Sequence, residues 1–261
     1  MSSTELAWRV GVTVRTGFAE YRAANPPAIL LTTTLPRAVL QCLFFTLLGR
    51  AIGGPDGARF AYVGAVALIL TLATMASIGD VPMLEKWSGT FYRLQGGVLR
   101  PATTFFLRAL PWVAEAVVSA LLCIVIVGPA TGQGALTVTL LAAFPLYAVM
   151  AVTAAAAGAA VAAPAVGRRA DVLFGNVLAY LTVACCGALI PAGRVALLDA
   201  VGTVLPLRNG ILAVRAVVDG APWAGHLLAE LAVGAGWALL GWILYAAQTR
   251  RSSRLGIDDF A

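Results

Sequence analysis

Residues 83–97 read MLEKWSGTFYRLQGG and separate two long apolar stretches of the chain. The apolar side chains of this segment recur at helical spacing on one side, and they are Leu84, Trp87, Phe91 and Leu94. Such a patterned helix between two apolar stretches is typical of a surface that contacts a cytoplasmic partner. The alternative is an interfacial helix whose apolar side rests among lipid headgroups.

The composition predicts an integral membrane protein. Sixty percent of the 261 residues are apolar and 11% are charged, and the mean hydropathy is +0.88. A soluble domain carries roughly 25% charged residues. Because lipid offers no partner to a free backbone amide, the spans must be helices. We therefore expect an all-α integral membrane protein with a single transmembrane domain over residues 1–261.

Six segments reach the roughly 20 residues that a helix needs to cross the hydrocarbon core. We place these transmembrane helices at residues 29–48, 60–78, 110–127, 135–163, 172–190 and 224–247. A glycine- and proline-rich turn at residues 53–57 separates the first two. Small residues favour close packing of the fourth and sixth spans, namely residues 154–160 together with Gly234, Gly236 and Gly241.

The basic residues predict that both termini lie in the cytoplasm. Most of the 18 lysines and arginines fall in the segments that this topology places inside, as the positive-inside bias requires. The net charge of +6 therefore reports topology, and we expect no nucleic-acid partner because no soluble basic face exists. The low lysine count and the abundant arginine, alanine and valine suggest a GC-rich bacterium. We accordingly expect a multi-pass protein of a bacterial plasma membrane.

Three further segments flank or connect these spans. Residues 1–25 form an apolar stripe at helical spacing, with Ser2 and Glu5 placed as a capping box, and predict an amphipathic helix on the inner membrane surface. Residues 191–222 contain two apolar pieces too short to cross, which suit re-entrant or interfacial helices that cap the outer side. Residues 248–261 are expected to be a cytoplasmic tail.

Three charged residues lie within the predicted spans. Each of them, Arg37, Glu115 and Glu230, should face protein or water because a charge at the bilayer centre costs about 2.5–3.5 kcal/mol. Arg37 and Glu115 fall in the inner half of the membrane, which predicts an ion pair. Glu230 lies nearer the outer surface and is expected to line a cavity or to meet one of the arginines of the outer segment, Arg194, Arg208 or Arg215. The two interpretations are structural pairing and lining of a substrate path.

Catalytic constellations are scarce in the sequence. One histidine and four scattered cysteines give no metal-ligand spacing, so we expect no metal site, and the cysteines are expected to be apolar filler. The phosphate-binding pattern G-x-x-x-x-G-K-[ST] does not occur. If ATP drives this protein, another subunit must supply the nucleotide site.

The chain resembles the permease subunits of type-2 ATP-binding-cassette (ABC) exporters, which include drug- and antibiotic-efflux permeases and carriers of lipid-linked glycans. The most specific match is Glu85-x-x-x-Gly89-Thr90-Phe91-x-x-Leu94, which looks like the E-x-x-x-G-T-[LF]-x-x-L of the family's coupling helix.

A second match, in the outer segment, is Gly187-x-x-x-Pro191 followed by Pro206-Leu207 and Arg215. The chain departs from the family at Val98, where a proline is common, and at Val195–Ala196, where a Leu-Pro pair is usual. These departures bear on the subfamily and its cargo.

The resemblance implies a transport subunit that is not itself an enzyme. It would pair with a second permease copy, identical or homologous, and with two ABC ATP-binding subunits that hold ATP and Mg. Residues 83–97 would be the coupling helix, anchored in the ATPase by Trp87, Phe91 and Leu94, with Glu85 and Arg93 at the rim. The cargo would be amphipathic or hydrophobic. The competing interpretation is an ion-coupled secondary carrier that uses Glu115 and Glu230.

Overall fold

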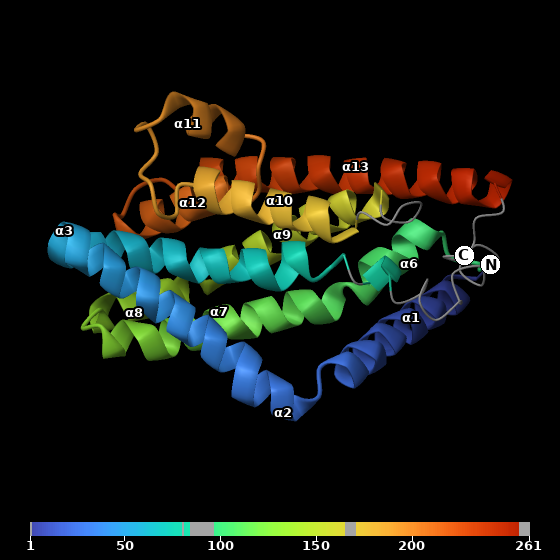
Figure 1. Cartoon of the computed structure of the whole chain (residues 1–261), viewed down its shortest axis with the longest axis horizontal. Coiled ribbons are helices and arrows are strands. Elements are labelled where there is room, and N and C mark those ends of the chain that lie inside the picture. Colours follow the sequence, from blue (N-terminus) through green and yellow to red (C-terminus); the bar gives the residue numbers. More distant parts are fainter. Residues whose placement is uncertain (1, 80, 84–96, 165–170, 256–261) are drawn as a thin grey trace.

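The computed structural model describes residues 2–79, 81–83, 97–164 and 171–255. Within these ranges the secondary structure is helical, with no β-strand. Long helices run side by side along the long axis, and the start of the first helix and the end of the last lie at the same end of the molecule (Figure 1). The predicted all-α fold is confirmed.

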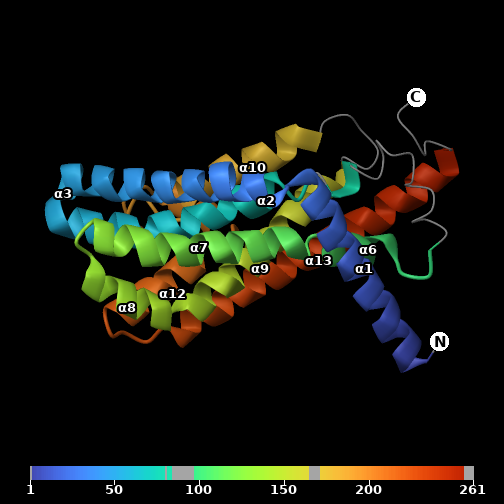
Figure 2. The same cartoon turned by 90° about the horizontal axis from the view of Figure 1, so that it is seen from below.

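The N-terminal helix α1 (Ser3–Ala24) begins and ends as its sequence predicts. The Ser2 hydroxyl accepts a hydrogen bond from the backbone N–H of Glu5 at 3.2 Å, which satisfies one of the free amides of the first turn. The Glu5 carboxylate does not complete the box and instead pairs with Arg9 at 2.8 Å. The helix ends before Asn25, and two prolines follow. Figure 2 shows α1 projecting at an angle to the other helices.

The next segment is a helical hairpin. It comprises α2 (Pro27–Ile29), a π-helical turn (Leu30–Thr34), α3 (Leu35–Thr71) and a second π-helical turn (Leu72–Ala76). Helix α3 is interrupted at Gly53 and Gly54, and Gly54 has a φ of +62°, which residues with a side chain rarely adopt. The chain doubles back there (Figure 1), so the predicted turn is confirmed.

Four helices follow residue 97 along the chain. They are α6 (Pro101–Arg108), α7 (Leu110–Ala130), α8 (Gly134–Ala142) and α9 (Phe144–Ala162). The last helix, α13 (Ala224–Leu255), packs along α9. A Cβ added at Gly234 would lie 2.4 Å from Thr153, and one at Gly241 would lie 3.2 Å from Ala160. Gly236 faces open space, so the prediction that it packs against a helix is wrong.

The segment between α9 and α13 differs most from expectation. Helix α10 (Asp171–Cys185) ends five residues before the predicted boundary at residue 190, because Gly187 turns the backbone to a φ of +77°. At 15 residues and 1.5 Å per residue it is roughly 22 Å long, too short to cross by itself. Two short helices then occupy the predicted outer segment, α11 (Ala196–Gly202) and α12 (Arg208–Val218).

Four helical stretches of the described chain are long and apolar enough to cross a membrane. They are Pro27–Met83, Pro101–Ala130, Phe144–Ala162 and Ala224–Gln248. The first of them contains both arms of the hairpin. These stretches support a multi-pass membrane protein, and the six separate spans that the sequence predicts stay a prediction.

The hydrophobic core surrounds the return arm of the hairpin. Tyr62, Val66 and Leu70 on this arm pack with Ile124 of α7 and Met150 of α9. The outgoing arm exposes large apolar side chains instead, namely Leu40, Phe44, Leu47, Leu48 and Ile52. An apolar face of this kind in a membrane protein is solvated by lipid or by another subunit.

The return arm of the hairpin packs tightly against the backbone of Ala188 at Gly64. This close contact predicts that a larger side chain at position 64 lowers the stability of the fold. A Cβ added at Gly64 would lie 2.2 Å from the carbonyl oxygen of Ala188, and this backbone has little room to shift. We expect Gly64→Ala to destabilise the fold by about 1–3 kcal/mol, measured as a lower unfolding temperature in detergent. The matched control is Gly236→Ala, which has open space and should be neutral or slightly stabilising. Equal unfolding temperatures for the two variants would contradict the close contact.

Candidate functional site

Glu230 of α13 is fully buried and holds the start of α12. Its carboxylate accepts hydrogen bonds from the backbone N–H groups of Leu207, at 2.9 Å, and Gly210, at 3.0 Å. It also accepts one from the hydroxyl of Thr153 on α9. A negative charge is favourable at this place because free N–H groups and the positive end of the helix dipole gather at a helix N-terminus.

This arrangement corrects the expectation that Glu230 meets an arginine or lines a cavity. Its charge is balanced by backbone N–H groups, and two arginines of the outer segment, Arg208 and Arg215, have other partners. Leu207, the residue before α12, has a φ of +73°. A non-glycine residue rarely adopts this conformation, so the carboxylate also helps to hold a strained turn.

A second polar cluster fastens α11 to α12. Arg208, the first residue of α12, pairs with Asp199 of α11 at 2.6 Å. Asp199 also accepts a hydrogen bond from the backbone N–H of Gly193 at 2.7 Å. The ion pair with Arg208 and the hydrogen bond from Gly193 keep the two short helices and the preceding loop joined.

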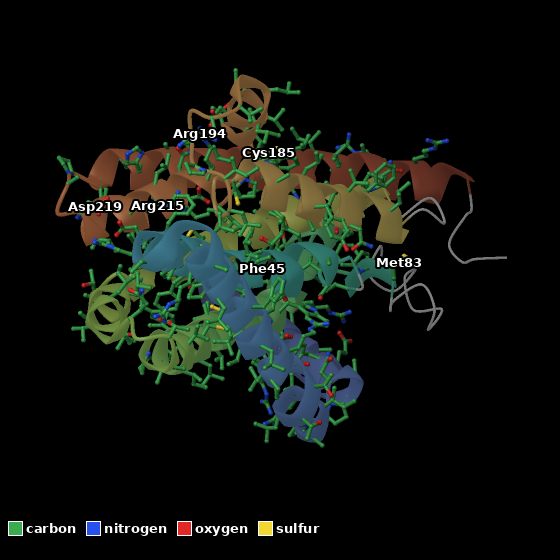
Figure 3. The ribbon with its side chains drawn as sticks, turned by 60° about the vertical axis from the view of Figure 1, so that its left-hand side comes forward. Phe45, Met83, Cys185, Arg194, Arg215 and Asp219 are labelled. Carbon is green, nitrogen blue, oxygen red and sulfur yellow. The ribbon has the colours of Figure 1, made fainter. Side chains whose placement is uncertain are left out.

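A third cluster ties α12 to the return arm of the hairpin. The Arg215 guanidinium lies 3.7 Å from the ring centroid of Phe60, in a cation–π contact, and donates a hydrogen bond to the carbonyl of Ala188 at 3.4 Å. Arg59 pairs with Asp219 at 3.3 Å. Figure 3 shows Arg215 and Asp219 at one end of the molecule and Met83 at the other. These contacts fasten α12 at the end opposite to the termini.

Arg37 and Glu115 lie near each other, yet they do not form the predicted ion pair. No nitrogen–oxygen distance between these two described side chains is 4.0 Å or less; Glu115 instead accepts a hydrogen bond from the Tyr21 hydroxyl at 2.6 Å. Both side chains border a space of about 20 Å³, next to Gln41 and Ser119. That volume holds about one water molecule. The sequence reasoning missed Tyr21 as a partner, although the tyrosine stands in the predicted apolar stripe of α1.

Helix α1 is docked on the α6–α7 corner by a chain of contacts. Gly17 fits against the backbone of Arg108, since an added Cβ would lie 2.9 Å from its Cα. Glu20 pairs with Arg108 at 3.5 Å, and the Tyr21 ring meets the Trp112 ring edge-on at 4.8 Å. The N-terminal helix is therefore part of the folded bundle.

The predicted coupling residues are outside the described part of the chain. They are Leu84, Glu85, Trp87, Gly89, Thr90, Phe91, Arg93 and Leu94. Met83, the last described residue before them, is buried and lies at the end of the molecule that carries the start of α1 (Figures 1 and 3). Among the described residues no group of three or more histidine, cysteine, aspartate or glutamate side chains is placed to hold a metal ion.

Comparison with known proteins agrees with this architecture. The sequence matches the family described as ABC-2 type transporter over residues 21–218, which is most of the chain and extends from the end of α1 through α12. No curated protein matches it. The matched region includes the hairpin, α7, α9 and the outer pair α11 and α12. The chain belongs to the ABC-2 type transporter family and is a membrane component of an ABC transporter.

Proposed function

We propose that this chain is the membrane-spanning subunit of an ATP-driven exporter that moves an amphipathic or hydrophobic substrate. Family membership carries this proposal, because ABC-2 membrane components work with an ABC ATP-binding partner. The absence of a phosphate-binding loop from the sequence fits a nucleotide site on that partner. Drug or antibiotic efflux and glycolipid export remain the two cargo classes that the resemblance favours.

The proposed topology has six membrane passages with both termini in the cytoplasm of a bacterial cell. The two arms of the hairpin supply the first two passages, α6–α7 and α8–α9 the next two, and α13 the last. Helix α10 is too short to cross the core unaided, so the fifth passage would be completed by the loop and by α11 and α12, which would lie within the outer leaflet. The start of α1 and the end of α13 share one end (Figure 2), which supports an even number of passages.

Residues 83–97 are the proposed contact with the ATPase. Met83 lies at the end of the molecule that the basic residues assign to the cytoplasm. Two ATPase copies and a second permease copy would complete the transporter. ATP must favour one permease conformation by about 5.5 kcal/mol to switch the population from 1:99 to 99:1. The lever for that switch would be the helix that carries Trp87 and Phe91.

The contacts of the buried carboxylates weigh against an ion-coupled carrier. The oxygens of Glu230 are taken by two backbone N–H groups and a hydroxyl, and one oxygen of Glu115 is taken by the Tyr21 hydroxyl. On the side where Arg37 lies, Glu115 borders a space of about 20 Å³, which holds about one water molecule. A structural role explains these contacts.

Reconstitution in vesicles tests the proposal. We expect the purified chain alone to move no solute, and the chain with its ATPase to transport only with ATP. Vanadate should stop that transport, whereas a protonophore should leave it unchanged. The matched control is the same complex with the nucleotide-binding lysine of the ATPase replaced. Nucleotide-independent transport by this chain alone, stopped by the protonophore, would show an ion-coupled carrier instead.

A further inference from the structure

A cavity of about 640 Å³ lies between α1, the start of the hairpin and α7. Its volume is within the roughly 300–1,000 Å³ of ordinary ligand sites. Most of its wall is apolar and includes Phe18, Leu30, Leu35 and Val118. Because α1 lies at the end of the bundle that carries the termini (Figure 2), the cavity is located where a headgroup region meets the ends of the spans. Its occupant must therefore have an apolar part.

Two arginines of α1 supply the polar side of this cavity. Arg15 and Arg22 both line it and are seven residues apart, so they project from the same side of the helix with Phe18 between them. Neither forms an ion pair or a hydrogen bond with any described residue. An amphipathic helix that keeps two cations free beside an apolar hollow is suited to an anion.

The carboxylate in the same cavity does not reverse this preference. Glu115 lines it, but one of its oxygens is bonded to the Tyr21 hydroxyl, and Arg37 borders the space on its other side. The charged groups around the cavity are thus three arginines and one glutamate. The balance is positive, which favours a negatively charged ligand over a cationic one.

The contacts of α1 explain why the cavity persists. Helix α1 is fixed to α6 and α7 through three of its residues, Gly17, Glu20 and Tyr21. Arg15, Phe18 and Arg22 are therefore held over the space, and Tyr21, which also lines it, carries one of the docking contacts. The cavity is bounded by α1, by the start of the hairpin and by α7. The surface of a single span has no such walls.

We propose that this cavity binds one anionic phospholipid of the leaflet at which α1 lies. The phosphate is held by Arg15 and Arg22, and an acyl chain lies against Phe18, Leu30, Leu35 and Val118. The lipid joins α1 to the hairpin and α7 and thereby steadies the helix that also contacts α6. This proposal requires a membrane protein but no ATPase, so it stands or falls separately from the proposed export function.

Native mass spectrometry of the full-length chain in detergent tests the site. We expect one molecule of dioleoyl phosphatidylglycerol to bind, with dioleoyl phosphatidylcholine binding much more weakly. The double variant Arg15→Gln/Arg22→Gln should bind phosphatidylglycerol roughly 30-fold more weakly, since each arginine near a membrane surface contributes about a factor of five. Arg15→Lys/Arg22→Lys, which keeps both charges, should retain most of the binding.

Two matched variants separate the cavity from general charge effects. Arg9→Gln/Arg251→Gln removes the same charge from exposed or half-exposed positions outside the cavity and should leave lipid binding unchanged. Ala114→Trp adds bulk to an exposed position of the cavity wall and should abolish binding of the lipid while the arginines remain. Equal losses in the charge control, full binding by Ala114→Trp, equal binding of the two lipids, or displacement of the lipid by inorganic phosphate would each overturn the proposal.

Discussion

Glu230→Ala is expected to unfasten α12 from α13 and to lower the stability of the protein by roughly 2–6 kcal/mol. The substitution leaves the buried N–H groups of Leu207 and Gly210 without acceptors, and each such group costs about 1–3 kcal/mol. It also removes the negative charge that the N-terminus of α12 favours. The measurement is thermal unfolding of the purified protein in detergent.

A second measurement locates the effect. Cys185 and Cys186 are buried at the end of α10, and Arg208 at the start of α12 donates a hydrogen bond to the Cys185 carbonyl at 3.4 Å. If α12 loosens, these two thiols should react with a maleimide much faster than in the unaltered protein. Cys42 and Cys123, buried between the hairpin and α7, should stay protected and serve as internal controls.

Two further variants, one at the same position and one elsewhere, set the scale of this expected loss of stability. Glu230→Gln keeps one carbonyl oxygen and should lose roughly half as much stability as Glu230→Ala, because a single acceptor can still serve one N–H group. Glu5→Ala removes a carboxylate from an exposed i,i+4 pair with Arg9 and should change stability by about 1 kcal/mol or less. An unchanged unfolding temperature and unchanged labelling in Glu230→Ala would show that α12 is held by other contacts.

Phe91→Asp is expected to abolish ATP-driven transport while the protein still inserts into the membrane. The sequence pattern places Phe91 in the apolar stripe with Trp87 and Leu94, and a buried aromatic anchor at an interface contributes about 2 kcal/mol or more. An aspartate there would also place an unpaired charge in the contact. Binding of the ATPase should weaken roughly 30-fold or more, measured by co-purification and by ATP-dependent uptake into inverted vesicles.

Ser88→Asp is the matched control for this experiment. It adds the same charge to the same segment at a position outside the predicted stripe, and it should leave both binding and transport close to normal. A Phe91→Asp variant that transports normally with a tightly bound ATPase would remove residues 83–97 from the proposed interface. Equal losses in both variants would show that charge anywhere in the segment is harmful, which would also contradict the aromatic anchor.

Features set by neighbouring residues could be predicted from the sequence. The cap at Ser2, the end of α1 before Asn25 and the reversal at Gly53 and Gly54 are all present. Each depends on the conformational preferences of residues a few positions apart, so the chain itself carries the information. The membrane class follows in the same way from the excess of apolar residues, which must be solvated whatever the tertiary arrangement.

The end of α10 shows the limit of that reasoning. Hydropathy continues through residue 190, but the helix ends at Cys185 because the backbone turns at Gly187. The loop then brings Ala188 against Gly64 of the hairpin. Hydropathy measures how favourable a residue is in lipid and does not report where a close contact with another helix requires the chain to leave the helix.

The partners of the buried charges depended on the tertiary structure. Glu115 bonds to Tyr21, which is 94 residues away, and Glu230 binds the backbone N–H groups that start α12. From charge alone, arginines were the expected partners of both glutamates. Backbone N–H groups could not be predicted as partners, because every residue except proline carries one. The sequence by itself determined a helical membrane protein with its N-terminal helix and its first hairpin, because those follow from local preference and total hydrophobicity. Only the packing of distant helices decided which polar groups meet, because a buried charge is stabilised by whichever donors the fold brings within hydrogen-bond distance.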